Sequence, residues 1–324
     1  MQRPAICIVT PALADAGNGN WRTARRWAGM LASDFRVELS ASWQGGDARL
    51  LIALHARRSA DSIRRWAEQM PHRPLVVVLT GTDVYRDIHR DESARRSLQL
   101  ADRLVVLQER ALDELAPEFR DKAIVCHQST PERSALAKTN RHLRALMVGH
   151  LREEKDPQTY FDAAALLGRR DDIRLDHVGS ALDESWAAKA RAARAAWPRY
   201  RWLGPLDHAA TLARIRRAHV LVHPSRMEGG AHVVMEAVRC GTPVLASRIP
   251  GNVGLLGEDY PGYFAVGDAT ALAAGLERCR DDEAFLPELA RHCAARSPLF
   301  DPLVEKATLQ AMVSSLLARS DGER

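Results

Sequence analysis

Short apolar runs alternate with helical patterns along the first half of the chain. The runs are mostly apolar throughout, as expected for parallel strands that are covered on both faces. Between two of them, apolar residues recur at helical spacing, at Trp21, Ala24, Ala28 and Leu31. The pattern predicts an α/β domain with a parallel sheet. Its expected strands are 5–9, 35–41, 50–54, 75–79, 104–107 and 123–126.

The second half repeats this alternation, which predicts a second doubly wound domain. Ser, Thr, Pro and Asn interrupt the pattern at 128–141, where we place a linker. We therefore expect domains at 1–135 and 142–298, with a C-terminal segment at 299–324 whose helix packs back on the first domain. The expected strands are 145–148, 173–178, 201–203, 220–223, 244–246 and 263–266. The expected helices are 158–167, 184–196, 209–217, 231–240, 270–279 and 302–318.

Composition is that of a soluble globular protein, with 46% apolar and 27% charged residues. No apolar run approaches the roughly 20 residues that span a bilayer. The run at 5–9 is too short for a signal peptide, so we expect a cytoplasmic protein without stable membrane insertion. The five cysteines lack C-x-x-C spacing and are expected to be buried, reduced thiols.

Net charge is +5, with a pI near 9.1. Many arginines form separated pairs, such as Arg64-Arg65 and Arg216-Arg217, without a dense basic run or an aromatic-rich basic stripe. Most are expected to lie on solvated helix faces. A nucleic-acid partner is therefore not predicted, although the pI alone would allow one.

The string from His223 to Val244, HPSRMEGGAHVVMEAVRCGTPV, carries the strongest chemical signal. A strand is followed by the Gly229-Gly230 turn, and a helix begins near Ala231. Free backbone N–H groups at a helix start form an anion site, and glycines let a phosphate approach closely. Glu228 and Glu236 could accept hydrogen bonds from sugar hydroxyls. Taken singly, each feature could equally be an ordinary turn or a surface glutamate.

Together these residues resemble the Glu-x7-Glu signature of the large retaining glycosyltransferase family (family 4-like) with the GT-B fold. The resemblance implies two Rossmann-like domains with an interdomain cleft that holds a UDP-sugar, and no cofactor. It implies that Glu236 binds the ribose, and that Glu228 faces the transferred sugar. The residues implied to lie beside the pyrophosphate and sugar are Gly229, Gly230, Ala231 and His232.

The segment GHLREEK, 149–155, resembles the family's Gly-Arg-Leu-x-x-x-Lys stretch. By this resemblance Lys155 is the catalytic cation that neutralises charge on the departing diphosphate. The family arginine is His150 here, so either Arg152 substitutes for it or the pyrophosphate is held less strongly. A plain surface lysine is the alternative for Lys155. The segment 203–206 resembles the loop that meets the uracil ring, which places Leu206 in the donor site.

Two first-half strings also resemble the family. The segment 11–20, with Gly17, Gly19 and Asn20, resembles its glycine-rich loop over the donor phosphates. LTGTD at 79–83 resembles a stretch whose family histidine is Thr80 here. A hydroxyl acceptor gains from such a base, whereas an acceptor that is already a strong anionic nucleophile does not. The expected acceptor residues here are Thr80, Gly81, Thr82 and Asp83.

His55, Arg57 and Arg58 follow another strand. They are interpreted either as the wall of an anion pocket or as solvated side chains at a helix start, and both interpretations stay open. The strings at 10–27, 53–59, 79–83 and 149–155 together resemble one subgroup, the selenosugar synthase of selenoneine biosynthesis. This resemblance implies UDP-N-acetylglucosamine as donor, selenophosphate as acceptor and a carbon–selenium bond in the product.

Three other functions remain open on sequence grounds. One is a GT-B glycosyltransferase with a hydroxyl acceptor, and another is a UDP-sugar epimerase or hydrolase on the same fold. The third, a nucleic-acid binder, rests on the pI alone. The chain has no D-x-D triplet and its histidines are dispersed, so no metal site is predicted.

Overall fold

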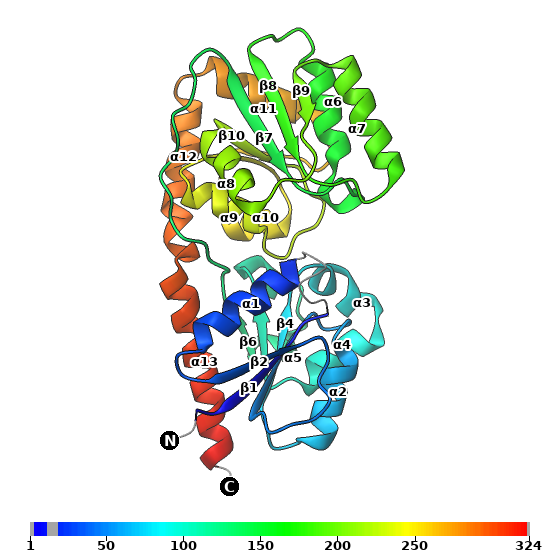
Figure 1. Ribbon diagram of the computed structural model, residues 1–324, viewed down its shortest axis with the longest axis vertical. Coiled ribbons are helices and arrows are strands. Elements are labelled where there is room, and N and C mark those ends of the chain that lie inside the picture. Colours follow the sequence, from blue (N-terminus) through cyan, green and yellow to red (C-terminus); the bar gives the residue numbers. More distant parts are fainter. Residues whose placement is uncertain (1–2, 12–18, 323–324) are drawn as a thin grey trace. The chain divides into compact units, whose positions relative to one another are not determined.

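The computed structural model describes residues 3–11 and 19–322. Its contacts divide the chain into two compact units (Figure 1). Unit 1 runs to Ser129 and includes the chain from Pro302 onward, and unit 2 is Thr130–Asp301. Each unit is built on its own parallel six-stranded sheet.

The sheet of unit 1 has the order β2-β1-β3-β4-β5-β6. Every side chain of the central strands β3 and β4 is buried, which accounts for their unbroken apolar sequences LLIAL and LVVVL. The strands are β1 Ala5–Val9, β2 Arg36–Ser40, β3 Leu50–Leu54, β4 Leu75–Leu79, β5 Arg103–Val106 and β6 Ala123–Val125.

Helices of unit 1 enclose two separate apolar cores. On one side, α13 packs beside α1 and closes a core that includes Ile6, Trp27 and Leu309 (Figure 1). The other core contains Trp43 and Trp66, in edge contact 5.1 Å apart. The helical elements are α1 Gly19–Leu31, α2 Ala60–Gln69, the π-helical turn Asp83–Asp87, α3 Ile88–Arg90, α4 Glu92–Leu100, the 3-10 turn Glu109–Leu112, α5 Pro117–Arg120 and α13 Pro302–Gly322.

Unit 2 has the sheet order β12-β11-β10-β7-β8-β9 around one large core. Its strands are β7 Leu143–Val148, β8 Ile173–Val178, β9 Tyr200–Trp202, β10 Val220–His223, β11 Val244–Ser247 and β12 Tyr263–Phe264. Its helices are α6 Pro157–Leu166, α7 Glu184–Ala196, α8 His208–Arg217, α9 His232–Arg239, α10 Pro250–Leu256, α11 Ala269–Asp281 and α12 Phe285–Arg296, with 3-10 turns at Glu153–Lys155 and Ser297–Phe300.

Strand order fixes where a ligand site is expected in each unit. In unit 2 the chain proceeds outward in both directions from the neighbouring strands β7 and β10, which makes their carboxyl ends a topological switch point. The loops that leave this point are 149–156 and 224–231. In unit 1 the corresponding strands are β1 and β3, followed by the segments from Thr10 and from His55.

The predicted strands all occur, with ends that differ by at most two residues from those expected. The division of the chain falls at Ser129 and Asp301, near the predicted linker and C-terminal segment. The helices α4, α10 and α12 were not expected as such. None of the described helices is long and apolar enough to cross a bilayer.

Candidate functional site

Lys155 and Glu228 form an ion pair at the switch point of unit 2. Lys155 ends the 3-10 turn after β7, and Glu228 lies in the loop after β10. Lys155 Nζ donates a hydrogen bond to Glu228 Oε1, and the two side chains are only 16% and 14% exposed. Two sequence-predicted catalytic residues are therefore in contact, although 73 positions separate them.

Local geometry holds this pair in place. Asp156, directly after Lys155, adopts a left-handed φ of 46° and caps α6, which turns the chain sharply behind the lysine. The Arg226 backbone N–H donates to Glu154 O at 2.9 Å, and its guanidinium lies 3.1 Å from Asp156 Oδ2. These contacts tie the two switch-point loops together.

His223, the last residue of β10, lies behind the ion pair. Its Nε2 is 3.7 Å from Glu228 Oε1. Burial lowers the pKa of His223 to about 4, against the opposing charge of Glu228, so the imidazole is neutral at pH 7. Burial would raise the pKa of Glu228, but the charge of Lys155 and the hydrogen bonds from Lys155 and Ser225 outweigh it and lower this pKa. Glu228 is therefore ionised at neutral pH.

Glu236 lies one turn into α9 and is surrounded by imidazoles. His208 Nε2 is 2.6 Å from Glu236 Oε1, and His232 Nδ1 is 3.3 Å from the same oxygen. Burial favours the neutral carboxyl, but the two histidines outweigh it and lower the pKa of Glu236 to about 2. An ionised carboxylate is thus held ready to accept hydrogen bonds.

The turn between the two glutamates leads into α9 with free donors. No protein acceptor is recorded within the described chain for the backbone N–H groups of Gly230, Ala231 and His232. Ala231 begins the helix as an N-cap without a side-chain hydrogen bond. Gly229 is buried and Gly230 half-buried. A helix start with unfilled donors favours an anion.

Two buried imidazole nitrogens near this turn make no well-aligned hydrogen bond. In the described part of the chain, His223 Nε2 and His232 Nδ1 have only carboxylate contacts, to Glu228 at 3.7 Å and to Glu236 at 3.3 Å. Buried polar groups are nearly always hydrogen-bonded in proteins, so a cluster of exceptions indicates a place that a ligand or water completes. The donor-site prediction and this independent feature fall on the same few residues.

The remaining predicted residues of unit 2 lie nearby with looser constraints. His150 is exposed, and its Nδ1 accepts from the Ser180 N–H at 3.3 Å. Arg152 is 45% exposed and lies 3.7 Å from Glu154. Leu206 is half-buried against the core of unit 2. These three stay predictions, because their side chains are not fixed toward the Lys155 pair.

Asp83 organises the predicted acceptor loop of unit 1 from within. It is fully buried, and its carboxylate accepts backbone hydrogen bonds from Ala56, Thr80 and Gly81 at 2.8 to 3.1 Å. With its oxygens occupied in this way, Asp83 fixes the shape of the loop, and its contact with an acceptor stays a prediction. Thr80 itself is half-buried.

His55 joins the two predicted acceptor segments. It has a left-handed φ of 74°, and its Nδ1 accepts from the Arg58 N–H at 3.4 Å. Nε2 therefore carries the proton and lies 3.2 Å from Thr82 Oγ1. Burial and the nearby arginines lower the pKa of His55, although Asp83 and Asp87 oppose them. The side chain is neutral, and both its nitrogens are occupied.

Arg57 and Arg58 differ in their surroundings. Arg57 Nε donates to Asp87 Oδ2 at 2.8 Å, whereas Arg58 is exposed. Both interpretations of the arginines, as the wall of an anion pocket or as solvated side chains, therefore remain open.

In the glycine-rich segment, Gly19 and Asn20 form the first turn of α1, and Gly17 lies outside the described residues.

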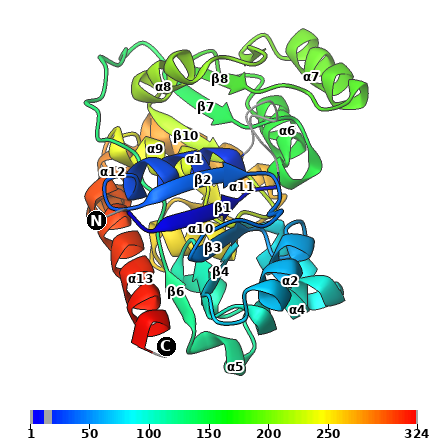
Figure 2. The ribbon, with the colours of Figure 1, turned by 60° about the horizontal axis from the view of Figure 1, so that its bottom comes forward.

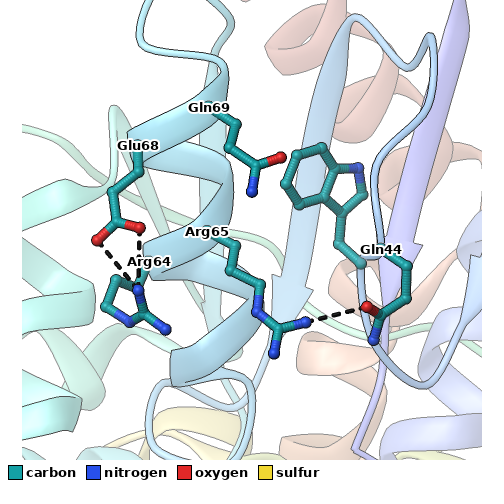
Figure 3. A pocket seen from close by; sticks show the side chains of 6 residues that line it. Gln44, Arg64, Arg65, Glu68 and Gln69 are labelled. Carbon is teal, nitrogen blue, oxygen red and sulfur yellow. Dashed lines mark hydrogen bonds and ion pairs between the residues drawn. The ribbon is translucent and has the colours of Figure 1, made fainter.

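A pocket of about 350 Å³ lies elsewhere in unit 1, beside α2 (Figure 3). Its polar groups bind one another, because Arg64 pairs with Glu68 and Arg65 donates to the amide oxygen of Gln44. It contains none of the predicted site residues, so we assign it no role. Its lining residues are Trp43, Gln44, Arg64, Arg65, Glu68 and Gln69.

Sequence analysis missed several residues that build the site. His208, His223 and Ser225 contact the two glutamates but have no recognisable spacing to them, and His208 lies 28 positions from Glu236. The one available signal was that His223 and Ser225 flank the predicted strand end. Among the described residues, no group of three His, Cys, Asp or Glu side chains is arranged to hold a metal ion.

Comparison of the sequence with protein-family models shows the family of the chain. The family model described as "Glycosyl transferases group 1" matches residues 128–298, just over half of the sequence. The chain belongs to this glycosyltransferase family. The matched region contains Lys155, Glu228 and Glu236, so the geometry described above lies within the family's own segment.

Curated relatives of this glycosyltransferase are similar over part of their length. Glycogen synthase of Mycobacterium tuberculosis is 34% identical over 195 residues, 55% of this chain and 43% of the relative. D-inositol 3-phosphate glycosyltransferase of Streptomyces avermitilis is 26% identical over 306 residues, 85% of this chain and 64% of the relative. The chain thus spans about half the length of the relatives it matches.

Solved structures agree with the predicted fold. Sucrose-phosphate synthase from Thermosynechococcus elongatus has a TM-score of 0.79 at 17% identity and covers 98% of this chain and 100% of its own. Anabaena HepE in complex with UDP and glucose has a TM-score of 0.75 at 16% identity, with 97% and 100% covered. The GT-B fold class is confirmed, and the predicted cleft stays a prediction.

Proposed function

We propose that this glycosyltransferase uses UDP-N-acetylglucosamine to glycosylate selenophosphate, forming a selenosugar. One observation carries the donor half of the proposal. The Lys155–Glu228 pair, Glu236 and the buried imidazoles of His223 and His232, whose facing nitrogens lack a well-aligned hydrogen bond, surround the start of α9. Relatives of the same fold support it, because HepE was solved with UDP-glucose and the pneumococcal O-GlcNAc transferase GtfA with UDP and GlcNAc.

In the donor site each residue has a separate task. Glu236 accepts hydrogen bonds from the ribose hydroxyls, since its low pKa keeps it ionised. The N–H groups of 230–232 bind the diphosphate. Lys155 leaves Glu228 for the diphosphate as the bond from the anomeric carbon to oxygen breaks, and stabilises the charge that departs with UDP. Glu228 is then free to orient the sugar, and Arg152 adds a second cation.

The acceptor half rests on the loops of unit 1 and on the subgroup resemblance. Thr80 stands where the family has a histidine, and the nearby His55 is neutral, with both nitrogens engaged. The described loop therefore offers no free general base. Selenophosphate needs none, because its selenium is already an anionic nucleophile that attacks the anomeric carbon. Arg57 and Arg58 would hold its phosphate oxygens.

A hydroxyl acceptor is the second candidate, and the activities of the curated relatives favour it. Glycogen synthase and D-inositol 3-phosphate glycosyltransferase imply sugar or cyclitol acceptors. An alcohol would require a base that takes its proton. Asp87 is one remaining carboxylate near His55, at 3.9 Å, but Arg57 already binds it.

Product identification by mass spectrometry tests the proposal. The protein is incubated with UDP-N-acetylglucosamine, UDP-glucose and UDP-galactose, each with selenophosphate, with inositol phosphate or with buffer alone. The proposal predicts UDP release and a product with the selenium isotope pattern only when selenophosphate is present. An oxygen-linked sugar product would support the hydroxyl-acceptor alternative, and sugar release or epimerisation without acceptor would support a hydrolase or epimerase.

A further inference from the structure

Cationic side chains gather at the amino-terminal edge of the sheet in unit 2. Arg144 and Arg174 are the second residues of β7 and β8 and pair in register. Arg201 of β9 pairs in register with Asp176, two residues beyond Arg174 and hence on the same face. Arg214 reaches Asp176 from α8, which lies beside β7 (Figure 2). Four guanidinium groups thus meet at one edge.

Asp176 does not balance this charge. It is fully buried and accepts from Arg201 at 2.7 and 2.8 Å and from Arg214 at 3.4 Å. In the part of the chain that the structure describes, no hydrogen bond or ion pair is recorded for the side chains of Arg144 and Arg174. The four arginines and this carboxylate leave a local excess of positive charge.

The neighbouring groups add no anion to the cluster. His219 is held neutral, because its Nδ1 accepts from the Arg144 N–H and its Nε2 donates to Thr139 O. Burial and the surrounding arginines lower the pKa of His142. The nearby Asp172 is taken by Arg170 and Arg280, at 2.9 and 2.7 Å. Burial lowers the pKa of Lys138, which also faces His219.

Buried nitrogens without a hydrogen bond mark this cluster. Eight buried side-chain nitrogen and oxygen atoms lack a recorded hydrogen bond in the described residues, and three of them are Arg144 Nε, Arg174 Nε and His142 Nε2. A buried donor without a partner is costly, and like charges side by side add to the cost. A bound oxyanion would accept hydrogen bonds from these donors and reduce the repulsion between the arginines.

We propose that Arg144, Arg174 and His142 form a second ligand site, which binds a phosphate dianion, either free or on a small phosphorylated molecule. Guanidinium forks match phosphate oxygens in geometry and charge. The site lies at the beginnings of the strands, whereas the proposed donor site lies at their carboxyl ends. Six residues of β7 separate the two edges by roughly 20 Å. The site is therefore distinct from the donor site and independent of the proposed transfer.

Calorimetric titration with inorganic phosphate tests this proposal. The full chain is titrated at low ionic strength without nucleotide, because the phosphates of UDP could themselves occupy the second site. Phosphate that binds at the donor site does so equally in all the proteins compared, so their difference reports the second site. We expect one phosphate at the second site in the wild type, binding there at least tenfold weaker in R144Q/R174Q, and wild-type binding in the control R191Q, an exposed arginine of α7. A separate failure to bind UDP would weaken the transfer proposal and leave this comparison unchanged.

The thermal unfolding temperature, Tm, distinguishes loss of the phosphate site from misfolding of the variant. Phosphate should raise the Tm of the wild type and of R191Q but not that of R144Q/R174Q. In phosphate-free buffer the double variant should unfold no earlier than the wild type, because a repulsion has been removed. Absent phosphate binding, equal binding in the double variant, or a lower Tm of that variant without phosphate would overturn the proposal. Displacement of phosphate by a short DNA duplex would replace it with nucleic-acid binding.

Discussion

Lys155 and Glu228 neutralise each other in the free protein, and this pairing explains how both can be largely buried. A buried ion pair is costly to break from one side, because the remaining charge loses its partner. In the proposed mechanism a diphosphate gives Lys155 a new partner and the sugar hydroxyls give one to Glu228, and together they offset that cost. The same contact would then serve stability without ligand and catalysis with it.

We predict that Lys155→Ala lowers kcat about 10² to 10³-fold, because the departing diphosphate loses a preorganised cation. Glu228 would also lose its partner, so the Tm should fall. Lys189→Ala is the matched control, since Lys189 stands over the Trp186 ring on α7, outside the site. Steady-state kinetics with the identified donor measures the effect. Near-normal turnover in the Lys155 variant would remove the lysine from the mechanism.

Buried histidines predict a pH dependence of stability. Burial lowers the pKa of His177 and of His223 to about 4. In the unfolded chain these histidines take up a proton near pH 6.5. Their contribution to the free energy of unfolding is therefore fully present above that pH and is lost as the pH falls toward 4. In His177→Gln, the slope of the unfolding free energy between pH 6 and 4.5 should decrease by about 1.4 kcal/mol per pH unit.

Urea titrations at several pH values measure this slope. The exposed His72 provides the control variant His72→Gln, which should keep the wild-type slope. An unchanged slope in His177→Gln would show that this imidazole accepts a proton in the folded state without penalty. That result would contradict its fixed neutral form between Tyr200 and Gly149.

At the residue scale, the sequence marks the two glutamates and the lysine as candidates but does not reveal their partners. Glu228 and Glu236 follow a recognisable spacing, whereas His208 reaches Glu236 from 28 positions away. The role of Asp83 also depends on three backbone N–H groups that only the folded loop brings together. Contacts of this kind are set by tertiary packing, which no local pattern encodes.

Among the elements, α10 supports the catalytic loop through one close approach. A Cβ added to Gly251 would lie 2.0 Å from the backbone oxygen of Glu228. We therefore predict that Gly251→Ala displaces Glu228, lowering both stability and kcat. Gly275→Ala is the control, since its added Cβ would meet only Leu245 side-chain atoms at 3.5 Å. Kinetics and thermal unfolding of both variants test this, and equal behaviour would contradict the packing argument.

Another element, α13, is anchored to unit 1 by a buried carboxylate. Glu305 accepts from Arg26 at 2.9 Å, from Trp27 Nε1 at 2.7 Å and from the backbone and hydroxyl of Ser129. We predict that Glu305→Ala costs about 3–5 kcal/mol, because these donors would stay buried without an acceptor. Glu68→Ala, which breaks an exposed pair with Arg64, should cost under about 1 kcal/mol.

Urea unfolding compares these two variants directly. A similar small loss in both would show that the Glu305 network contributes no more than a surface ion pair.

Element prediction from sequence succeeded where strands are continuous and apolar, as in β3 and β4. It missed α10 and α12, because α10 is short and contains two glycines and a proline, while α12 follows a helix directly without a strand between them.

At the scale of the whole molecule, the chain builds two similar sheets, to which we assign different tasks as a proposal. The strand–helix alternation predicted both domains, and the strand order places the site loops at the switch point of each sheet. The pairing order itself was not predictable, since it depends on which crossovers close a common core. The chain's return to unit 1 through α13 joins residues near both ends of the sequence in one core.

The central claim is that unit 2 holds the diphosphate and ribose of a UDP-sugar at the start of α9. Calorimetric titration with UDP tests it most directly, on wild type, Lys155→Ala, Glu236→Gln and the exposed control Glu184→Gln. The account predicts one site in the wild type and the control, with binding at least tenfold weaker in the other two variants. Equal UDP affinity in all four proteins, or no binding to the wild type, would contradict it.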